Sequence, residues 1–229
     1  MFTASLLRLL HLCDPALPIG GFPHSAGLET YVQQNIVKDK ETAKEFVVQQ
    51  LRHNIHYTDA ALLSLAYNAA EENIIETVLS LDETCTAVKL TKEMRIASNK
   101  LGIRLLKIFQ SEETFVLLKR YKAEIQSQNV SGHYCITFGL LAHALSISKP
   151  DALTGFYYNA ATGFVTNSVK LIPLGQQDGQ NILLSIFPLI EELVKISMNP
   201  DEDMIGYCCT GFDIKSMQHE QLYTRLYMS

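Results

Sequence analysis

The sequence predicts an all-α protein, a single bundle-like domain of about eight to ten helices that spans residues 1–229. Three observations predict this class. Apolar residues recur at steps of three and four along most of the chain, which is the period of an α-helix. The alternation typical of a strand is rare, and Asp178-Gly179 follows glutamines instead of joining two β-branched runs. The loops are short, and no linker, repeat or low-complexity tract divides the chain.

The clearest helix is predicted over residues 83–110, where Asp82 stands at the position of an N-cap. One face of this helix is apolar and an adjacent face is basic. The apolar positions are Leu90, Met94, Ala97, Leu101, Leu105 and Ile108, and the basic positions are Lys89, Lys92, Lys100, Arg104 and Lys107.

The same period predicts the remaining helices. Before the long helix, the first predicted helix covers residues 3–12. A second begins after Ser25, which would cap it, and reaches Gln34, and three more cover residues 40–56, 59–70 and 72–80. The helices over residues 40–56 and 59–70 would be nearly continuous. After the long helix they cover residues 112–127, 133–147, 150–171 and 176–197, and we expect Pro188 to kink the last of these. The longer loops fall at 14–24 and 198–211.

The composition indicates a globular protein without general affinity for nucleic acid. Hydrophobic residues make up 47% and charged residues 19% of the chain, and the net charge is −5. The five cysteines form no C-x-x-C pair and are expected to be reduced. No signal peptide and no apolar run of membrane-spanning length is present, so we expect a cytoplasmic protein that does not enter a membrane.

Common catalytic motifs are missing from the sequence. It contains no P-loop, no G-x-G-x-x-G, no G-x-S-x-G and no H-E-x-x-H, so we expect no enzyme activity. His53 and His56 lie three apart, with Asp59 one turn on, and could form a metal pair. A solvated or capping pair is the more common arrangement, and we predict no metal site. A small all-α enzyme with an unrecognised site would need an acid–base pair in a pocket.

Three segments stand out from this helical background. Residues 14–29 hold three prolines and three glycines together with large apolar side chains, which predicts a rigid loop that either connects two helices or presents a surface to a partner. Residues 170–180 break one helix and open the next with neutral glutamine amides, which suits a structural corner or a binding surface.

The third segment is the tail, residues 212–229. Chain ends are usually polar and frayed, but this one is rich in Tyr, Met and Leu, which are residues that need burial. Burial on the bundle of the same chain and burial on another chain, as a helix in a groove, are both open on physical grounds.

Together these segments resemble the UreF family of urease accessory proteins. The matching stretches are Ala16-Leu-Pro-Ile-Gly-Gly-Phe22 with His24-Ser25 and Gly27-Leu-Glu29, Arg95-Ile-Ala-Ser98 with Leu101-Gly102, Leu171-Ile-Pro-Leu-Gly-Gln176 with Asp178-Gly-Gln180, and in the tail Asp213-Ile214, Ser216-Met217, His219-Glu220, Leu222-Tyr223 and Arg225-Leu226. Their order and spacing extend over essentially the whole chain. Cys13 and Gln218 depart from the family pattern. The family often has Arg where Gln218 stands in this sequence.

The resemblance implies a dimerising all-α adaptor. Its relatives bind UreD, called UreH in some organisms, and that pair recruits the GTPase UreG. The assembly delivers nickel to the urease apoprotein, so nickel and GTP would be handled by the assembled complex, and no cofactor is expected on this chain alone. The alternative is that the chain regulates UreG directly, as a GTPase activator or a fidelity gate, through Arg95, Arg225, Gln176 or Gln180.

The resemblance also implies two groups of site residues. The partner-binding residues in the tail would be Met217, His219, Glu220, Tyr223, Arg225, Leu226 and Tyr227. The second group forms a surface of family motifs: Pro18, Gly20, Gly21, His24, Gly27, Glu29, Arg95, Lys170, Gly175, Gln176 and Gln180.

Overall fold

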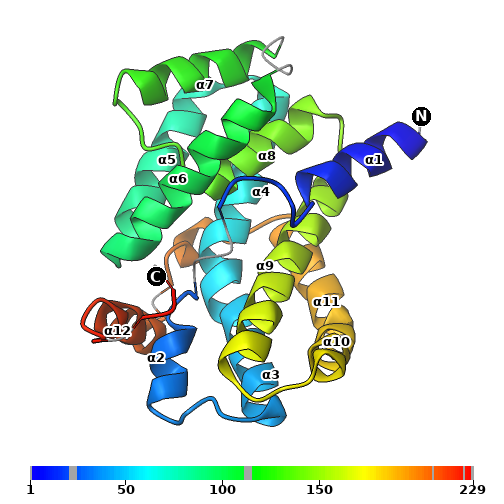
Figure 1. Cartoon of the computed structure of the whole chain (residues 1–229). Coiled ribbons are helices and arrows are strands. Elements are labelled where there is room, and N and C mark those ends of the chain that lie inside the picture. Colours follow the sequence, from blue (N-terminus) through cyan, green and yellow to red (C-terminus); the bar gives the residue numbers. More distant parts are fainter. Residues whose placement is uncertain (1, 21–24, 111–114, 208, 224, 228–229) are drawn as a thin grey trace.

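A long helix, α9 (Lys149–Leu171), runs through the middle of the fold (Figure 1). The structure is a computed structural model that describes residues 2–20, 25–110, 115–207, 209–223 and 225–227. Helix α9 begins where the Ser148 side chain accepts a hydrogen bond from the Asp151 N–H and Pro150 occupies the first turn. It contacts α1, α2, α3, α4, α8, α10 and α11, so most of the chain is arranged around it.

The first third of the chain forms two separate helices and then a continuous helical rod. Helices α1 (Phe2–Leu12) and α2 (Leu28–Gln33) are separated by the proline-rich loop. Helix α3 (Lys40–Gln49), the π-helix η1 (Gln50–Ala60) and α4 (Ala61–Glu72) then follow without a break. This confirms the near-continuity that the sequence predicts for residues 40–70.

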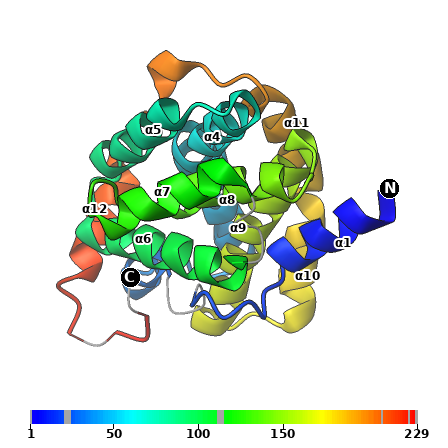
Figure 2. The same ribbon diagram turned by 90° about the horizontal axis from the view of Figure 1, so that it is seen from above.

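The other helices form a layer above the rod and a layer beside α9. The upper layer holds α5 (Ile75–Val88), α6 (Lys92–Ile108), α7 (Val116–Gln126) and α8 (Tyr134–Ala144) (Figures 1 and 2). Helices α10 (Gln176–Ser185) and α11 (Phe187–Ser197) pack on α9, followed by the 3₁₀ turn η3 (Glu202–Met204) and α12 (Thr210–His219). Every regular element among the described residues is helical, which confirms the all-α prediction.

The predicted helix over residues 83–110 is wrong as a single element. The structure divides it into the end of α5 and the whole of α6, and residues 89–91 lie between them. Lys89 turns inward to pair with buried Asp59, while the Arg95 guanidinium donates to the carbonyls of Lys89 and Leu90. These contacts, one of them 30 positions long, stabilise the break although the apolar period continues through it. Asp82 therefore lies inside α5 and is not an N-cap.

Two further helix boundaries differ from the prediction. Gly27, not Ser25, precedes α2, and the Ser25 side chain is buried. The expected kink in residues 176–197 is a full break at Ile186, and Pro188 stands in the first turn of α11, where its missing N–H costs nothing. The prediction of a helix over residues 72–80 ends inside α5, so residues 75–108 hold two helices as predicted but with the break in another place. The break at Ile186 and the unpredicted α12 each add a helix, so the described residues contain more helices than the eight to ten predicted.

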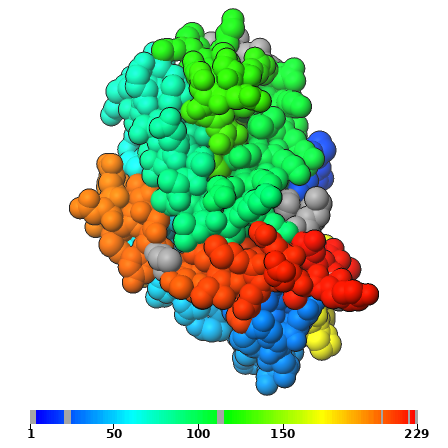
Figure 3. All heavy atoms as spheres, turned by 90° about the vertical axis from the view of Figure 1, so that its left-hand side faces the viewer, coloured from blue at the N-terminus to red at the C-terminus, as the bar shows by residue number. Residues whose placement is uncertain are grey.

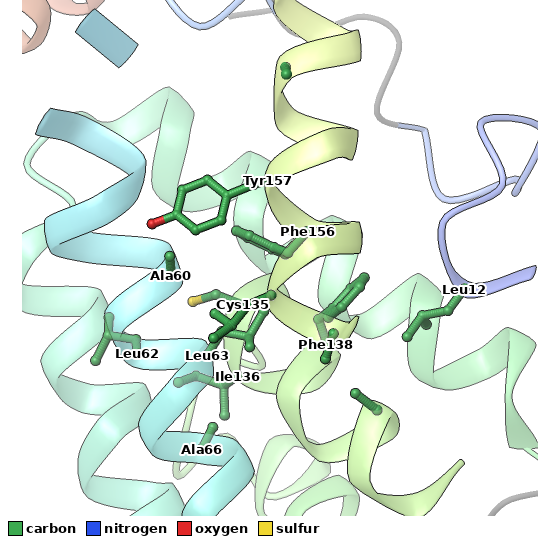
Figure 4. Close-up of a cluster of buried hydrophobic side chains, with 14 of the residues drawn as sticks. Leu12, Ala60, Leu62, Leu63, Ala66, Cys135, Ile136, Phe138, Phe156 and Tyr157 are labelled. Atoms are coloured by element: carbon green, nitrogen blue, oxygen red, sulfur yellow. The ribbon is translucent and has the colours of Figure 1, made fainter. Parts of the chain in front are cut away.

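The core lies where α4, α8 and α9 meet (Figure 4). Leu63 and Ala66 from α4 face Ile136 and Phe138 from α8, with Tyr157 of α9 above them. Helices α4 and α8 approach closely because Gly139 has no side chain: a Cβ there would lie 2.6 Å from the Leu63 carbonyl oxygen. None of the described helices combines the length and apolar character needed to cross a bilayer.

Candidate functional site

The two unusual segments at opposite ends of the sequence meet in space. Helix α12 packs on α2 and also contacts α6. Figure 3 shows the C-terminal segment, coloured orange to red, lying across the face of the molecule with α2 in blue below it. Gly27 contacts α12: an added Cβ would stand 3.4 Å from the Ser216 backbone, which is an ordinary van der Waals distance. The glycine is favoured here by its φ of +79°, which turns the chain into α2.

Glu29 of α2 holds the end of the tail. Its carboxylate accepts hydrogen bonds from the backbone N–H of Leu226 at 2.8 Å and of Tyr227 at 3.2 Å, and its Oε2 lies 3.2 Å from Nε2 of His219. Glu29 is buried, so these bonds replace the water that the carboxylate loses. Burial and then the adjacent Glu29 carboxylate raise the pKa of the Tyr227 phenol.

Glu93 of α6 holds the tail from the other side. Its carboxylate lies 2.9 Å from Nδ1 of His219 and accepts a hydrogen bond from the Arg225 guanidinium, also at 2.9 Å. His219 is fully buried between the two carboxylates. Each ring nitrogen of His219 therefore lies within hydrogen-bond distance of a carboxylate oxygen, one from α2 and one from α6. The tail is thus held by a network of His219, Arg225, Glu29 and Glu93.

The outer side of the tail is apolar and open to solvent. Phe212, Ser216, His219 and Tyr227 point inward and are buried. Leu226 is 71% exposed and Tyr223 is fully exposed. We call the exposed apolar side chains of this segment the tail surface, and they are Ile214, Met217, Tyr223 and Leu226.

The tail thus meets both alternatives that the sequence leaves open. Part of it packs on its own bundle, and part of it remains available to another chain. Glu220 is exposed beside the tail surface. Gln218, which departs from the family pattern, accepts a hydrogen bond at 3.1 Å from the amide of Gln34 on the surface.

The proline-rich loop leads into this region. Pro18 is exposed, and Gly20 adopts a φ of +81° where the Arg104 guanidinium donates to the Ile19 carbonyl. Gly21 and His24, which the sequence places in the family-motif surface, lie outside the described residues. Arg95 is used within the chain, since it donates to the two carbonyls at the end of α5.

The segment of residues 170–180 lies elsewhere. Lys170 stands in the last turn of α9, and Gly175 precedes α10 and donates its N–H to the Asp178 carboxylate. Gln176 and Gln180 are exposed in the first turns of α10. Helices α10 and α12 stand on opposite sides of the molecule (Figures 1 and 2). The structure therefore brings the motifs with Gly27 and Glu29 to the tail, and it does not bring the glutamine corner there.

The possible metal pair on η1 has another role. His56 is buried, and its Nδ1 lies 3.0 Å from the Tyr157 hydroxyl and 3.1 Å from the Ser197 hydroxyl. Burial, followed by the charge of His53, lowers the pKa of His56. Asp59 turns away to pair with Lys89 at 2.8 Å. Within the residues that the structure describes, no group of three or more His, Cys, Asp or Glu side chains could hold a metal ion.

Sequence reasoning missed Glu93, which is central to the tail network. Its one sequence signal is that it is an acidic residue in the first turn of an otherwise basic helix. That placement is ordinary for a helix start, because acids stabilise the positive end of the helix dipole. Nothing local in the sequence shows that the carboxylate faces a histidine 126 positions later.

Comparison with known proteins first defines the class, which is that of accessory proteins to an enzyme. Two relatives carry the name urease accessory protein UreF. The one from Haemophilus influenzae (strain PittEE) is 50% identical to this chain, and the one from Actinobacillus pleuropneumoniae serotype 5b (strain L20) is 48% identical. Each alignment covers 96% of this chain, and 94% and 97% of the relative. A relative from Bacillus sp. (strain TB-90) with the same name is 36% identical over 98% of this chain and 99% of its own length.

The family model named UreF matches residues 37–187. The chain belongs to the UreF family, which confirms the resemblance drawn from its motifs.

Proposed function

We propose that this protein is an adaptor in urease maturation, and that the tail surface binds a UreD-type accessory protein (UreH in some organisms). In this proposal the pair recruits the GTPase UreG in the cytoplasm, and the assembly inserts nickel into the urease apoprotein. The chain itself does no chemistry. The observation that carries the proposal is the tail, whose exposed apolar side chains stand on a backbone held in place by hydrogen bonds to Glu29 and by the Arg225–Glu93 ion pair.

The inner and outer residues of the tail have different parts in this proposal. His219, Arg225 and Tyr227 are engaged by the body of the same chain, so they fix the shape of the segment. Met217, Tyr223 and Leu226 are the side chains that a partner can bury. Tyr and Met are enriched at protein interfaces, and a rigid backbone lowers the entropy lost on binding.

The test uses surface substitutions that leave the fold intact. We expect the double variant Tyr223→Ser, Leu226→Ser to bind a purified UreD homologue at least about tenfold more weakly, as removal of central interface side chains does. The matched control is Leu184→Ser, which removes an exposed leucine from α10 on the far side. Wild-type affinity in the double variant, with unchanged circular dichroism, would contradict the assignment of the tail surface.

Direct regulation of UreG is the second candidate, and the exposed amides of Gln176 and Gln180 are the observation in its favour. Amides can orient an attacking water in GTP hydrolysis, whereas Arg95 and Arg225 are engaged within the chain. Single-turnover GTP hydrolysis by UreG, with and without this chain and its UreD partner, distinguishes the two. An unchanged rate would leave the adaptor role alone.

We also propose that the chain forms a homodimer through α1 and the adjacent groove. Helix α1 extends away from the body (Figures 1 and 2) and exposes Leu6, Leu7 and Leu10. Beside it lies a cavity of about 500 Å³ whose lining includes Tyr158 and Phe187. A contiguous apolar face of this kind is typical of a surface that a second chain covers.

A further inference from the structure

Two cysteine thiols meet in the core. Cys85 comes from α5 and Cys135 from α8, and both side chains are fully buried. Their Sγ atoms are 3.6 Å apart. Figure 4 shows Cys135 within the cluster of apolar side chains. The other described cysteines, Cys13 and Cys209, are partly exposed.

The separation of the two sulfurs is close to what a disulfide requires. A disulfide bond is about 2.05 Å long, so the two Sγ atoms would have to approach by roughly 1.5 Å. Rotation of a cysteine side chain about its Cα–Cβ bond moves Sγ by a distance of this order. The bridge would join two helices of the upper layer whose cysteines are 50 positions apart.

The charges around the pair differ for the two thiols. Burial raises the pKa of Cys85, but hydrogen bonds from Cys135 and His133 and the Lys89 ammonium outweigh it and lower this pKa to about 6. Burial and then the adjacent Cys85 sulfur raise the pKa of Cys135. Other titratable groups near the pair are Asp59, Asp82 and Tyr121, and Asp59 disfavours a second negative charge. Cys85 is therefore the nucleophile and Cys135 the thiol that keeps its proton.

A cavity of about 300 Å³ lies beside the pair. Its lining includes Lys89 and Tyr134, the neighbour of Cys135 in the sequence, and it includes neither cysteine. Lys89 thus faces this cavity and also influences both thiols. A cavity of this size admits water and hydrogen peroxide. The two sulfurs have no exposed surface, so any oxidant must pass the side chains between the cavity and the pair. We expect hydrogen peroxide to be small enough to do so and a tripeptide disulfide such as oxidised glutathione to be too large.

We propose that Cys85 and Cys135 form a reversible thiol–disulfide pair whose oxidant is hydrogen peroxide. The Cys85 thiolate attacks one peroxide oxygen, the O–O bond breaks, and a sulfenic acid and hydroxide form. The Cys135 sulfur then attacks the Cys85 sulfur, the S–O bond breaks, and water leaves with the Cys135 proton. Overall two thiols and one peroxide give one disulfide and two waters, and a dithiol reductant reverses the change.

The test maps thiols in the full-length protein. Reduced protein is treated with peroxide, denatured, alkylated, digested and analysed by mass spectrometry. We expect a peptide pair bridged between Cys85 and Cys135 that has lost two hydrogens and that dithiothreitol separates. Oxidised glutathione should give neither the bridge nor a mixed disulfide at these positions. A bridge that forms with glutathione disulfide but not with peroxide would overturn the choice of oxidant.

Two variants make the test specific. Cys135→Ala removes the resolving thiol, so dimedone should trap the Cys85 sulfenic acid and no bridge should form. Cys13→Ala is the matched control and should form the bridge as the wild type does. If Cys135→Ala does not fold, the wild-type peptide map still decides. Free, alkylated Cys85 and Cys135 after exposed cysteines have been oxidised would overturn the proposal.

Discussion

At the scale of single residues, buried carboxylates join parts of the chain that are far apart in sequence. Asp82 accepts hydrogen bonds from the backbone N–H groups of Ser131, Gly132 and His133 at 2.7–3.1 Å, and from the Tyr121 hydroxyl at 2.5 Å. Glu29 likewise accepts hydrogen bonds from two backbone N–H groups of the tail, those of Leu226 and Tyr227. A carboxylate can satisfy several donors at once, which suits the free N–H groups that precede a helix such as α8.

Substitution of Asp82 should be strongly destabilising. Asp82→Ala leaves buried N–H groups and a buried hydroxyl without an acceptor, so we expect the free energy of unfolding to fall by roughly 3–5 kcal/mol. Urea denaturation followed by circular dichroism measures this. Glu83→Ala is the control, because Glu83 is an exposed neighbour on the same helix and should change stability by less than about 0.5 kcal/mol. Equal effects of the two substitutions would contradict this account of Asp82.

The Asp59–Lys89 pair predicts a dependence on pH. Burial alone raises the pKa of Asp59, but the Lys89 ammonium and hydrogen bonds from Lys89 and Thr58 hold this pKa below its usual 3.8. The pair therefore stabilises the protein above the unfolded-state pKa, and this contribution is lost as the pH falls through the lowered value. In Lys89→Met the ammonium beside Asp59 is gone, so burial raises the pKa of Asp59. The free-energy cost of keeping this buried carboxyl group ionised then grows as the pH increases.

We therefore expect Lys89→Met to cost roughly 3–5 kcal/mol at pH 7 and less at pH 4, measured by urea denaturation at both pH values. The double variant Asp59→Asn, Lys89→Met leaves no charge uncompensated and should cost less than Lys89→Met alone. A pH-independent loss in Lys89→Met would show that packing of the lysine stem, not its charge, matters.

At the scale of elements, the apolar period predicts that helices exist but not where all of them end. It identified α1, α8 and α9 well because those ends coincide with ordinary caps and loops. It ended one helix at residue 80, inside α5, and joined the rest of α5 to α6. The period continues through residues 89–91, where the break depends on Lys89 reaching Asp59 30 positions earlier. Local spacing carries no record of such a contact.

The tail network predicts how α12 and the segment after it respond to a substitution in α2. Glu29→Ala removes the acceptor of the Leu226 and Tyr227 N–H groups and one neighbour of His219. We expect faster amide hydrogen exchange at residues 226 and 227 and a loss of roughly 1–3 kcal/mol in stability. Glu220→Ala, an exposed acid within the tail, is the control and should leave this exchange unchanged. Unaltered exchange in Glu29→Ala would mean that packing of Phe212 and Tyr227 holds the segment alone.

At the scale of the whole molecule, the fold joins its two ends into one site. The sequence identified Glu29, Gly27 and the tail as unusual segments, and their motif order indicated the family. It could not show that they touch, because this needs the positions of α2, α6 and α12 relative to one another. The same limit explains why Lys170, Gly175 and Gln176 were grouped with them although they lie on the other side.

The proposed homodimer is also a property of the whole molecule. If α1 and its adjacent groove form the interface, Leu7→Asp together with Leu10→Asp places two charges in an apolar contact that would have to bury them. We expect light scattering to give about twice the chain mass of 25.7 kDa for the wild type and the single-chain mass for the double variant. Both leucines are exposed, so the helical circular dichroism should be unchanged. Val116→Asp, an exposed position on α7, is the control and should leave the dimer intact. A dimer that persists in Leu7→Asp, Leu10→Asp would move the interface away from α1.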